Sequence, residues 1–405
     1  RFRGVVIALA CIATAYGVLV TLRSKLDVFP EFAPPQVIVH TATPGLSPEE
    51  VESLVTRPVE NGVSGAGSIE SIRSQSIQGL SVVTAIFREG TDVMRARQTV
   101  SERLVEFTDE LPDGVRAPVL DPLTSSTSLV LALGLPSRER SPMELRTMAD
   151  WTVRPRLLAV PGVAKVIEFG GDVRQIQVQV RPERLLAHGL SVRDVVSAAR
   201  EATGIRGAGF IETENQRIPI RTEGQSLPAE DLGESVVAAS SNGRLRLKDV
   251  ARVTDGPEPR IGDAAVNGEP GVLLLVWGQY GSNTLEVTDA VEAALAELKP
   301  SLDASGVHLE PRLFRPATFI EQSIRNVSLS MLLGGVLVAV VLFLFLFNLR
   351  TAFISITAIP LSLLSAVAVL DAFGATLNTL TLGGLAIAIG ALVDDAIIDV
   401  ENIFR

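Results

Sequence analysis

Cysteine, histidine and aromatic residues are scarce in this chain of 405 residues. The one cysteine, Cys11, excludes an internal disulfide, and the three histidines, His40, His188 and His308, are too far apart in sequence for a local zinc motif. The net charge of −10 and the lack of a basic run argue against nucleic acid as a partner. We expect no cofactor. The composition also excludes a collagenous, disordered or disulfide-rich secreted chain.

Hydrophobic and charged residues are segregated along the chain. Together, 47% hydrophobic residues, 20% charged residues and a mean hydropathy of +0.33 are unusual for a soluble protein of this length. The uncharged run from Gly4 to Leu22 has about the 20 residues that a spanning helix needs, so we expect a first membrane span over residues 1–25. The alternative is a cleaved signal peptide, but its apolar core would be only ~7–15 residues long, and no A-x-A cleavage site follows.

Three further spans are expected near the end of the chain, at residues 327–348, 351–370 and 379–401. The middle one contains Pro360, which neighbouring helices can accommodate in lipid. With four spans, the long segment between the first and the second lies on one side of the membrane.

Arginines indicate which side that is. Arg1, Arg3, Arg350 and Arg405 would share one face of the membrane, which the positive-inside rule assigns to the cytoplasm. The long segment would then lie outside the cytoplasm, giving a multi-pass membrane protein with a large exported domain. Because the chain starts without methionine and stops directly after a helix, we expect it to be part of a longer protein.

Short strands and amphipathic helices alternate in the exported segment, which predicts an α+β fold. A strand at Gln36–Thr43 precedes a capping box at Ser47, which opens a helix to about Val63. Strands at Ser68–Ile77 and Leu80–Phe87 and a helix at 92–111 follow. This order is that of a ferredoxin-like (split βαβ) subdomain, expected over residues 29–123.

The same order recurs over residues 124–180 and 261–318, which we expect to form a second such subdomain. Ser141 caps its first helix, and strands are expected at 128–135, 163–169, 175–180 and 271–277, with a second helix at 283–298. Residues 181–260 are expected to be an inserted subdomain with a capped helix at Ser191 and glycine-rich loops.

Charged residues recur at helical spacing in three segments, Glu49–Glu60, Arg95–Glu110 and Glu286–Glu297, which we interpret as solvated helix faces. The four methionines are interpreted as packing residues: Met94, Met143, Met148 and Met331. A soft-metal site needs clustered Cys, Met or His, so no metal ligand is identifiable in this chain.

Carboxylates occur inside the last apolar span. Asp394 and Asp395 lie about 15 residues into that span, roughly 22 Å along a helix axis and still within a hydrocarbon core of ~30 Å. A charge at such depth costs roughly 2.5 kcal/mol or more, so intramembrane carboxylates usually have a function. Mutual repulsion and burial both favour protonation of one of the two, which suits a proton relay.

Three polar residues follow the aspartate pair. Asp399 and Asn402 are better explained as headgroup residues at the end of the helix, whereas Glu401 fits either role. Glycines at 383, 384 and 390 are expected to let a neighbouring helix approach and keep the pair away from lipid.

The run GGLAIAIGALVDDAIIDVENIFR resembles the fourth transmembrane helix of resistance–nodulation–division (RND) efflux pumps. Three other stretches are similar to that family in order and spacing: LDVFPEFAPPQVIVHTATPGLSPEEVE, VPGVAKVIEFGG and LFLFNLRTAFISITAIPLSLL. The resemblance covers the N-terminal half of such a pump. Within the family, the phrases DVFPEFAPPQV and TLGGLAIAIGALVDDAIIDVENIFR look closest to the heavy-metal cation branch.

The resemblance implies a fold and a set of roles. It implies an inner-membrane, multi-pass protein whose large periplasmic domain contains two porter subdomains and an inserted docking subdomain. It also implies a homotrimer that meets a periplasmic adaptor and an outer-membrane channel, and proton-driven export of a metal cation. Asp394 and Asp395 match the proton-relay pair of the family, and Glu401 matches a nearby glutamate. Their expected lysine partner would come from a later helix, beyond Arg405.

The sequence therefore predicts a secondary active transporter and not an enzyme, with a metal cation, protons and the lipid bilayer as partners. One alternative is a pump for hydrophobic drugs or lipids, although with 5% aromatic residues no phenylalanine-lined pocket stands out. The other alternative is a non-transporting scaffold with the same fold, which would gain nothing from buried carboxylates.

Overall fold

The structure is a computed structural model of the chain. It describes residues 3–24, 26, 34–107, 111–124, 128–203, 210–213, 216–219, 228–240, 243–260, 262–346, 349–375, 377–388 and 391.

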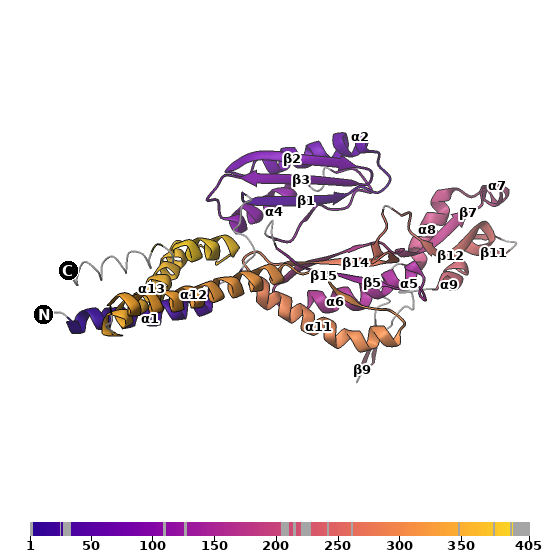
Figure 1. The fold of residues 1–405 in the computed structure, drawn as a ribbon. Coiled ribbons are helices and arrows are strands. Elements are labelled where there is room, and N and C mark those ends of the chain that lie inside the picture. Colours follow the sequence, from indigo (N-terminus) through magenta and orange to yellow (C-terminus); the bar gives the residue numbers. More distant parts are fainter. Residues whose placement is uncertain are drawn as a thin grey trace.

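Long apolar helices gather at one end of the molecule, and sheets with their helices fill the rest (Figure 1). The helices are α1 (Arg3–Arg23), α12 (Ala317–Leu346) and α13 (Leu349–Ala372), and a further helical stretch follows at Thr379–Ala388. Within the described residues, one helix, Gly4–Arg23, is long and apolar enough to cross a membrane by length and composition. Two shorter apolar helical stretches lie within the described residues, one at Pro360–Ala372 in the second half of α13 and one at Thr379–Ala388.

The first four-stranded sheet follows the predicted β-α-β-β-α-β order. Its strands are β1 (Gln36–Ala42), β2 (Ile69–Ile77), β3 (Leu80–Phe87) and β4 (Val119–Leu120), arranged β2-β3-β1-β4 with every pair antiparallel. Between them run α2 (Pro48–Val51), η1 (Glu52–Thr56), α3 (Arg57–Ser64) and α4 (Val93–Phe107). We refer to this unit as the first sandwich. Valines such as Val39 and Val83, together with Phe87, form its core against these helices.

The second sandwich repeats this arrangement. Its sheet has the order β6-β14-β5-β15, with the short β13 also on β14: β5 (Leu129–Pro136), β6 (Val163–Phe169), β13 (Ala265–Val266), β14 (Glu269–Gly278) and β15 (Glu310–Phe314). The covering helices are α5 (Pro142–Met148), η3 (Ala149–Val153), α6 (Arg154–Leu158) and α11 (Thr284–Ala304). No strand was expected at β15, and α11 runs beyond its expected end at residue 298.

Equivalent helices of the two sandwiches begin and bend in the same way. Ser47 and Ser141 each accept a hydrogen bond from the backbone of a glutamate three residues on, and that glutamate bonds back, so both predicted capping boxes are confirmed. Each helix then contains a π turn directly before an Arg-Pro pair. Proline lacks an N–H and its ring clashes with the carbonyl four residues back, and the wider π turn accommodates it.

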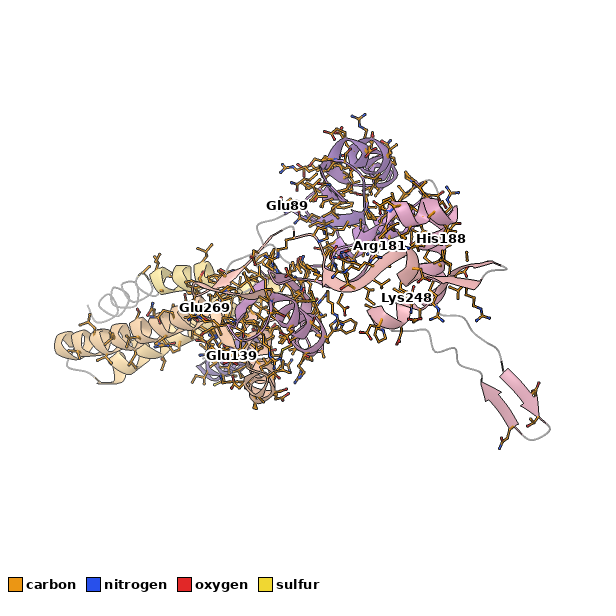
Figure 2. The ribbon with its side chains drawn as sticks, turned by 90° about the vertical axis from the view of Figure 1, so that its right-hand side faces the viewer. Glu89, Glu139, Arg181, His188, Lys248 and Glu269 are labelled. Carbon is orange, nitrogen blue, oxygen red and sulfur yellow. The ribbon has the colours of Figure 1, made fainter. Side chains whose placement is uncertain are left out.

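An inserted unit leaves the second sandwich between β6 and β13. It contains β7 (Arg174–Val180), α7 (Pro182–His188), α8 (Val192–Thr203), β8 (Phe210–Thr213), β9 (Gln216–Pro219), α9 (Ala229–Gly233), β10 (Val236–Ser240), β11 (Gly243–Arg246), α10 (Leu247–Val250) and β12 (Ala251–Pro257). Figure 2 shows Arg181, His188 and Lys248 of this unit on the side of the molecule away from the long helices.

One strand predicted from the sequence lies in a different sheet from the one expected, so that prediction is wrong. The strand at 175–180 was expected in the second sandwich, but β7 pairs along its whole length with β12 in a separate two-stranded sheet. Val178 and Val180 pack on the core of the inserted unit. The unit therefore begins before β7 rather than at residue 181, because the hydrogen-bonding partner of a strand is set by tertiary structure and not by its own sequence.

Candidate functional site

The predicted proton-relay residues, Asp394, Asp395 and Glu401, lie outside the described residues. The structure does describe the beginning of their helix. The Asn378 Oδ1 accepts hydrogen bonds from the backbone N–H groups of Leu380 and Thr381, each at 3.0 Å, and Asn378 is only 2% exposed. This N-cap fixes the start of the helix at Thr379, the start assumed in the sequence analysis.

The start of this helix packs against α1 and α13. Leu385 lies in one apolar cluster with Val20 of α1, Val367 of α13 and Leu377. Leu377 also forms a parallel β-bridge with Leu26, just after α1. The first, third and fourth predicted spans are therefore in contact near one end of the helical region.

α1 and α13 approach closely at Gly17, a glycine for which no such role was predicted. A Cβ on Gly17 of α1 would lie 2.6 Å from the Leu364 Cβ and 2.9 Å from the Leu364 carbonyl oxygen of α13. Small residues let helices in a membrane pack this closely. A Cβ on Gly383 or Gly384, in contrast, would meet no described atom within 4 Å, so the expected approach at these two glycines is not made by the described part of the chain.

The two sandwiches are joined by an ion pair at the connection between them. Asp121 follows β4, and its Oδ2 lies 2.6 Å from the Lys165 Nζ on β6. The other oxygen, Oδ1, lies 3.8 Å from the His40 Nε2 on β1, and the Lys165 ammonium lies 5.4 Å from the centre of the Trp277 ring. The Asp121 and Lys165 side chains are 17% and 21% exposed, so this pair is well shielded from water.

A cavity of about 270 Å³ lies at the same junction. Gln36, Asp92 and Met94 of the first sandwich line it together with Leu123 and Tyr280. The Asp92 carboxylate accepts from the Met94 backbone N–H at 2.9 Å and so caps α4. Met94 is 65% exposed and the lining holds one carboxylate, which is too few donors for a metal site.

The side of the second sheet that faces away from the helices carries apolar residues. Leu273 of β14 pairs with Gly134 and Phe169, and Leu275 pairs with Ala132 and Ile167. Directly paired residues point to the same face, opposite to the core residues between them. Phe169 at the edge is 45% exposed. This outer face is a candidate surface for an apolar ligand or partner.

Glu168 is a buried carboxylate between the second sheet and its helices. Its side chain is 6% exposed, and burial raises the pKa of this carboxyl above its ordinary value although Arg154 and Arg146 act against the rise. The Arg154 Nε lies 3.2 Å from the Glu168 Oε1, but that oxygen accepts no hydrogen bond. The pair is thus an ion pair by distance with poor bonding geometry.

No group of three or more His, Cys, Asp or Glu residues suited to a metal ion is found among the described residues. Met148 packs on the core of the second sandwich, in agreement with its interpretation as a packing residue.

Comparisons with known proteins agree over nearly the whole chain. The model of the AcrB/AcrD/AcrF family matches residues 2–405. The cation efflux system protein CzcA of Alcaligenes sp. (strain CT14) is 35% identical over 398 residues, 96% of this chain and 37% of that protein. The cation efflux system protein CusA of Escherichia coli (strain K12) is 35% identical over 400 residues, 97% of this chain and 38% of that protein.

A solved structure shares the fold. The crystal structure of a heavy metal efflux pump (crystal form I) has a TM-score of 0.85 and 30% sequence identity, and the match covers 100% of this chain and 40% of that one. The chain therefore spans less than half the length of these relatives.

Proposed function

Because this chain belongs to the AcrB/AcrD/AcrF family, we propose that it is part of a proton-driven exporter of metal cations, an RND pump of the inner membrane. The observation that carries the proposal is the similarity to proteins named for cation efflux over 96% to 97% of the chain. The likeness at 30% identity to the structure of a heavy metal efflux pump supports the same substrate class.

In this proposal the aspartate pair takes up and releases the driving proton. Asp394 and Asp395 follow an apolar stretch that begins at Thr379, directly after the N-cap Asn378. A pair of carboxylates within lipid is costly, so such residues are usually present because they have a function. Glu401 is the third member of the relay. The metal is the substrate, and no residue of this chain is assigned as its ligand.

The two sandwiches correspond to porter subdomains and the inserted unit to a docking subdomain. We place the first porter subdomain at residues 29–123 and the second at 124 to about 173 with 261–318. The inserted unit, enlarged by β7, would contact an outer-membrane channel and a neighbouring subunit. The assembly is a homotrimer with a periplasmic adaptor, and the spans are residues 1–25, 327–348, 351–370 and 379–401.

Substitution of the aspartate pair tests the proposal. Asp394→Asn and Asp395→Asn, made in the complete protein, are each expected to abolish metal resistance in a strain that lacks other exporters, with trimer assembly unchanged. Asp371→Asn is the matched control, because it makes the same change on the loop side of α13 and leaves the relay intact. Resistance that persists in the Asp394→Asn/Asp395→Asn double variant overturns the relay, and so does an equal loss in the control.

A pump for hydrophobic compounds is the second candidate. The apolar outer face of the second sheet, with Phe169 and Phe314 each 45% exposed, favours it. Resistance to lipophilic drugs but not to metal salts in the same strain would support this candidate. A scaffold without transport activity predicts neither resistance nor an effect of the aspartate substitutions.

A further inference from the structure

We propose that Arg315 is a positioning residue that couples α12 to the second sandwich, so that movement of this helix in the membrane moves the sheet. The inference rests on the proposed transport function and assigns one specific link between the membrane and the exported part.

The connection between the sheet and the helix is short. β15 ends at Phe314 and α12 begins at Ala317, with only Arg315 and Pro316 between them. The first turn of the helix is already anchored, because the Ala317 and Ile320 side chains are both 0% exposed. A rigid helix attached in this way has no flexible linker to absorb its motion.

α12 is also long enough to act as a lever. Its 30 residues extend over about 45 Å at 1.5 Å per residue. Figure 1 shows it running from the second sandwich, where its start lies near α11, into the helical end of the molecule. The proposed span at 327–348 occupies the far part of this rod, and the nearer part lies against the sandwich.

Arg315 links α11 and α12 near the N-terminal end of α12. The Arg315 Nε lies 2.9 Å from the Glu292 Oε1 on α11, and the Arg315 Nη1 lies 2.8 Å from the Glu321 Oε1 on α12. A third carboxylate, Asp289 of α11, lies 3.6 Å away. The Arg315 side chain is only 13% exposed, and its planar guanidinium presents a fixed fork of five donors to both helices, whereas a lysine ammonium has three donors and no fixed fork.

Glu292 is the anchor on the sandwich side. Its side chain is 17% exposed, and it also binds Arg312 of β15 through two bonds of 2.7 and 3.0 Å. The two arginines hold the pKa of the Glu292 carboxyl below its ordinary value despite burial. Glu292 is therefore ionised at neutral pH and remains available to Arg315.

α11 is tied to the membrane region at its other end as well. The backbone N–H of Thr284, the first residue of α11, donates to the carbonyl of Leu26, just after α1, at 3.2 Å. α11 is thus bonded to Leu26, after the first span, through Thr284, and to Arg315, just before α12, through Glu292. Other residues of α11 pack on the core of the second sandwich. α11 is well placed to receive motion of α12 through Arg315.

The chain offers a matched pair of variants for the test. Arg315→Gln removes the link to α12. Arg312→Gln also removes a partner of Glu292, but Arg312 is 62% exposed and touches no residue of α12 in the described ion pairs. We expect Arg315→Gln to lower the maximal rate of metal transport into proteoliposomes at least tenfold with the KM within twofold, and Arg312→Gln to leave both within twofold. Arg315→Lys is expected to recover part of the rate.

Glu321→Gln covers the case in which Arg315→Gln does not assemble. It removes the negative charge that Arg315 binds on α12, at a side chain that is 43% exposed, and is expected to assemble normally and to show a loss of rate. Wild-type rates in Glu321→Gln overturn the coupling, and so does an equal loss in Arg312→Gln.

A spectroscopic readout separates this inference from the proposed function. Spin labels at Ala296 on α11 and Ser328 on α12, both exposed, are introduced into the complete protein after every native cysteine, including Cys11, is replaced by serine. Pulsed dipolar spectroscopy is expected to give a narrow distance distribution in the wild type and in Arg312→Gln, and a broad one in Glu321→Gln. Unchanged distributions in all variants contradict the coupling whether or not the protein exports a metal, whereas absence of transport in the wild type refutes only the proposed function.

Discussion

Gly17 offers the sharpest test of how the long apolar helices α1 and α13 pack. An alanine Cβ at this position would lie 2.6 Å from the Leu364 Cβ and 2.9 Å from the Leu364 carbonyl oxygen. Carbon atoms in favourable contact lie about 3.5–4.0 Å apart, so α1 and α13 would have to separate by about 1 Å. No side-chain rotation relieves this clash, because both Leu364 atoms are fixed by the helix backbone. Overpacking of this kind typically costs about 1–3 kcal/mol.

We therefore expect Gly17→Ala to lower the free energy of unfolding of the complete protein in detergent micelles by that amount. The measurement is a denaturant titration followed by circular dichroism. Gly4→Ala is the control on the same helix, since a Cβ there meets nothing within 4 Å, and it is expected not to lower the free energy of unfolding.

A second substitution at Leu364 makes the test more specific. Leu364→Ala keeps the Cβ and should not rescue Gly17→Ala. Leu364→Gly removes the Cβ and should recover part of the stability that Gly17→Ala loses. The recovery is reduced by up to about 1 kcal/mol, the cost of placing a glycine within a helix. If Gly17→Ala and Gly4→Ala prove equally stable, the close packing of α1 on α13 is refuted.

Two further predictions concern titratable groups of the sandwiches. Lys165→Met leaves the Asp121 carboxylate, which is 17% exposed, without its closest partner, and we expect the free energy of unfolding to fall by roughly 1–3 kcal/mol. In a double-mutant cycle with Asp121→Asn, the loss in the double variant should be smaller than the sum of the two single losses. Additive losses would show that the pair does not interact. The pKa of Glu168 is raised in the folded protein, so the fold favours the protonated carboxyl, and stability is lost as the pH rises from the unfolded pKa of 4.5 towards the folded pKa. Glu168→Gln should not show this loss in unfolding titrations at different pH values. Parallel pH–stability curves for the variant and the wild type would contradict this prediction.

Local signals in the sequence predicted much of the fold. Ser47 and Ser141 were identified as helix starts, and both cap as expected, because a capping box involves residues only three apart. Asn378 likewise begins a helix where the last apolar span was expected to start. These features depend on neighbours in the chain, and the sequence contains those neighbours.

Charged residues were less predictable. Glu292 lies within Glu286–Glu297, which was interpreted as a solvated face, and this is wrong for Glu292 because it is 17% exposed and held by Arg312 and Arg315. Helical spacing shows that residues share a face, but it does not show what packs on that face. The arginines come from β15 and its junction with α12, and no strand was expected at β15.

The sequence by itself determined the element order of the two sandwiches, their helix caps and the apolar segments, since each follows from periodicity or from contacts a few residues apart. The resemblance to a family also came from sequence, and it is the source of the roles proposed for Asp394 and Asp395. Only the tertiary structure decided that β7 pairs with β12, that Gly17 lies against Leu364 and that Arg315 joins α11 to α12. The physical reason is that these contacts join residues far apart in the chain, whose meeting depends on how whole elements pack.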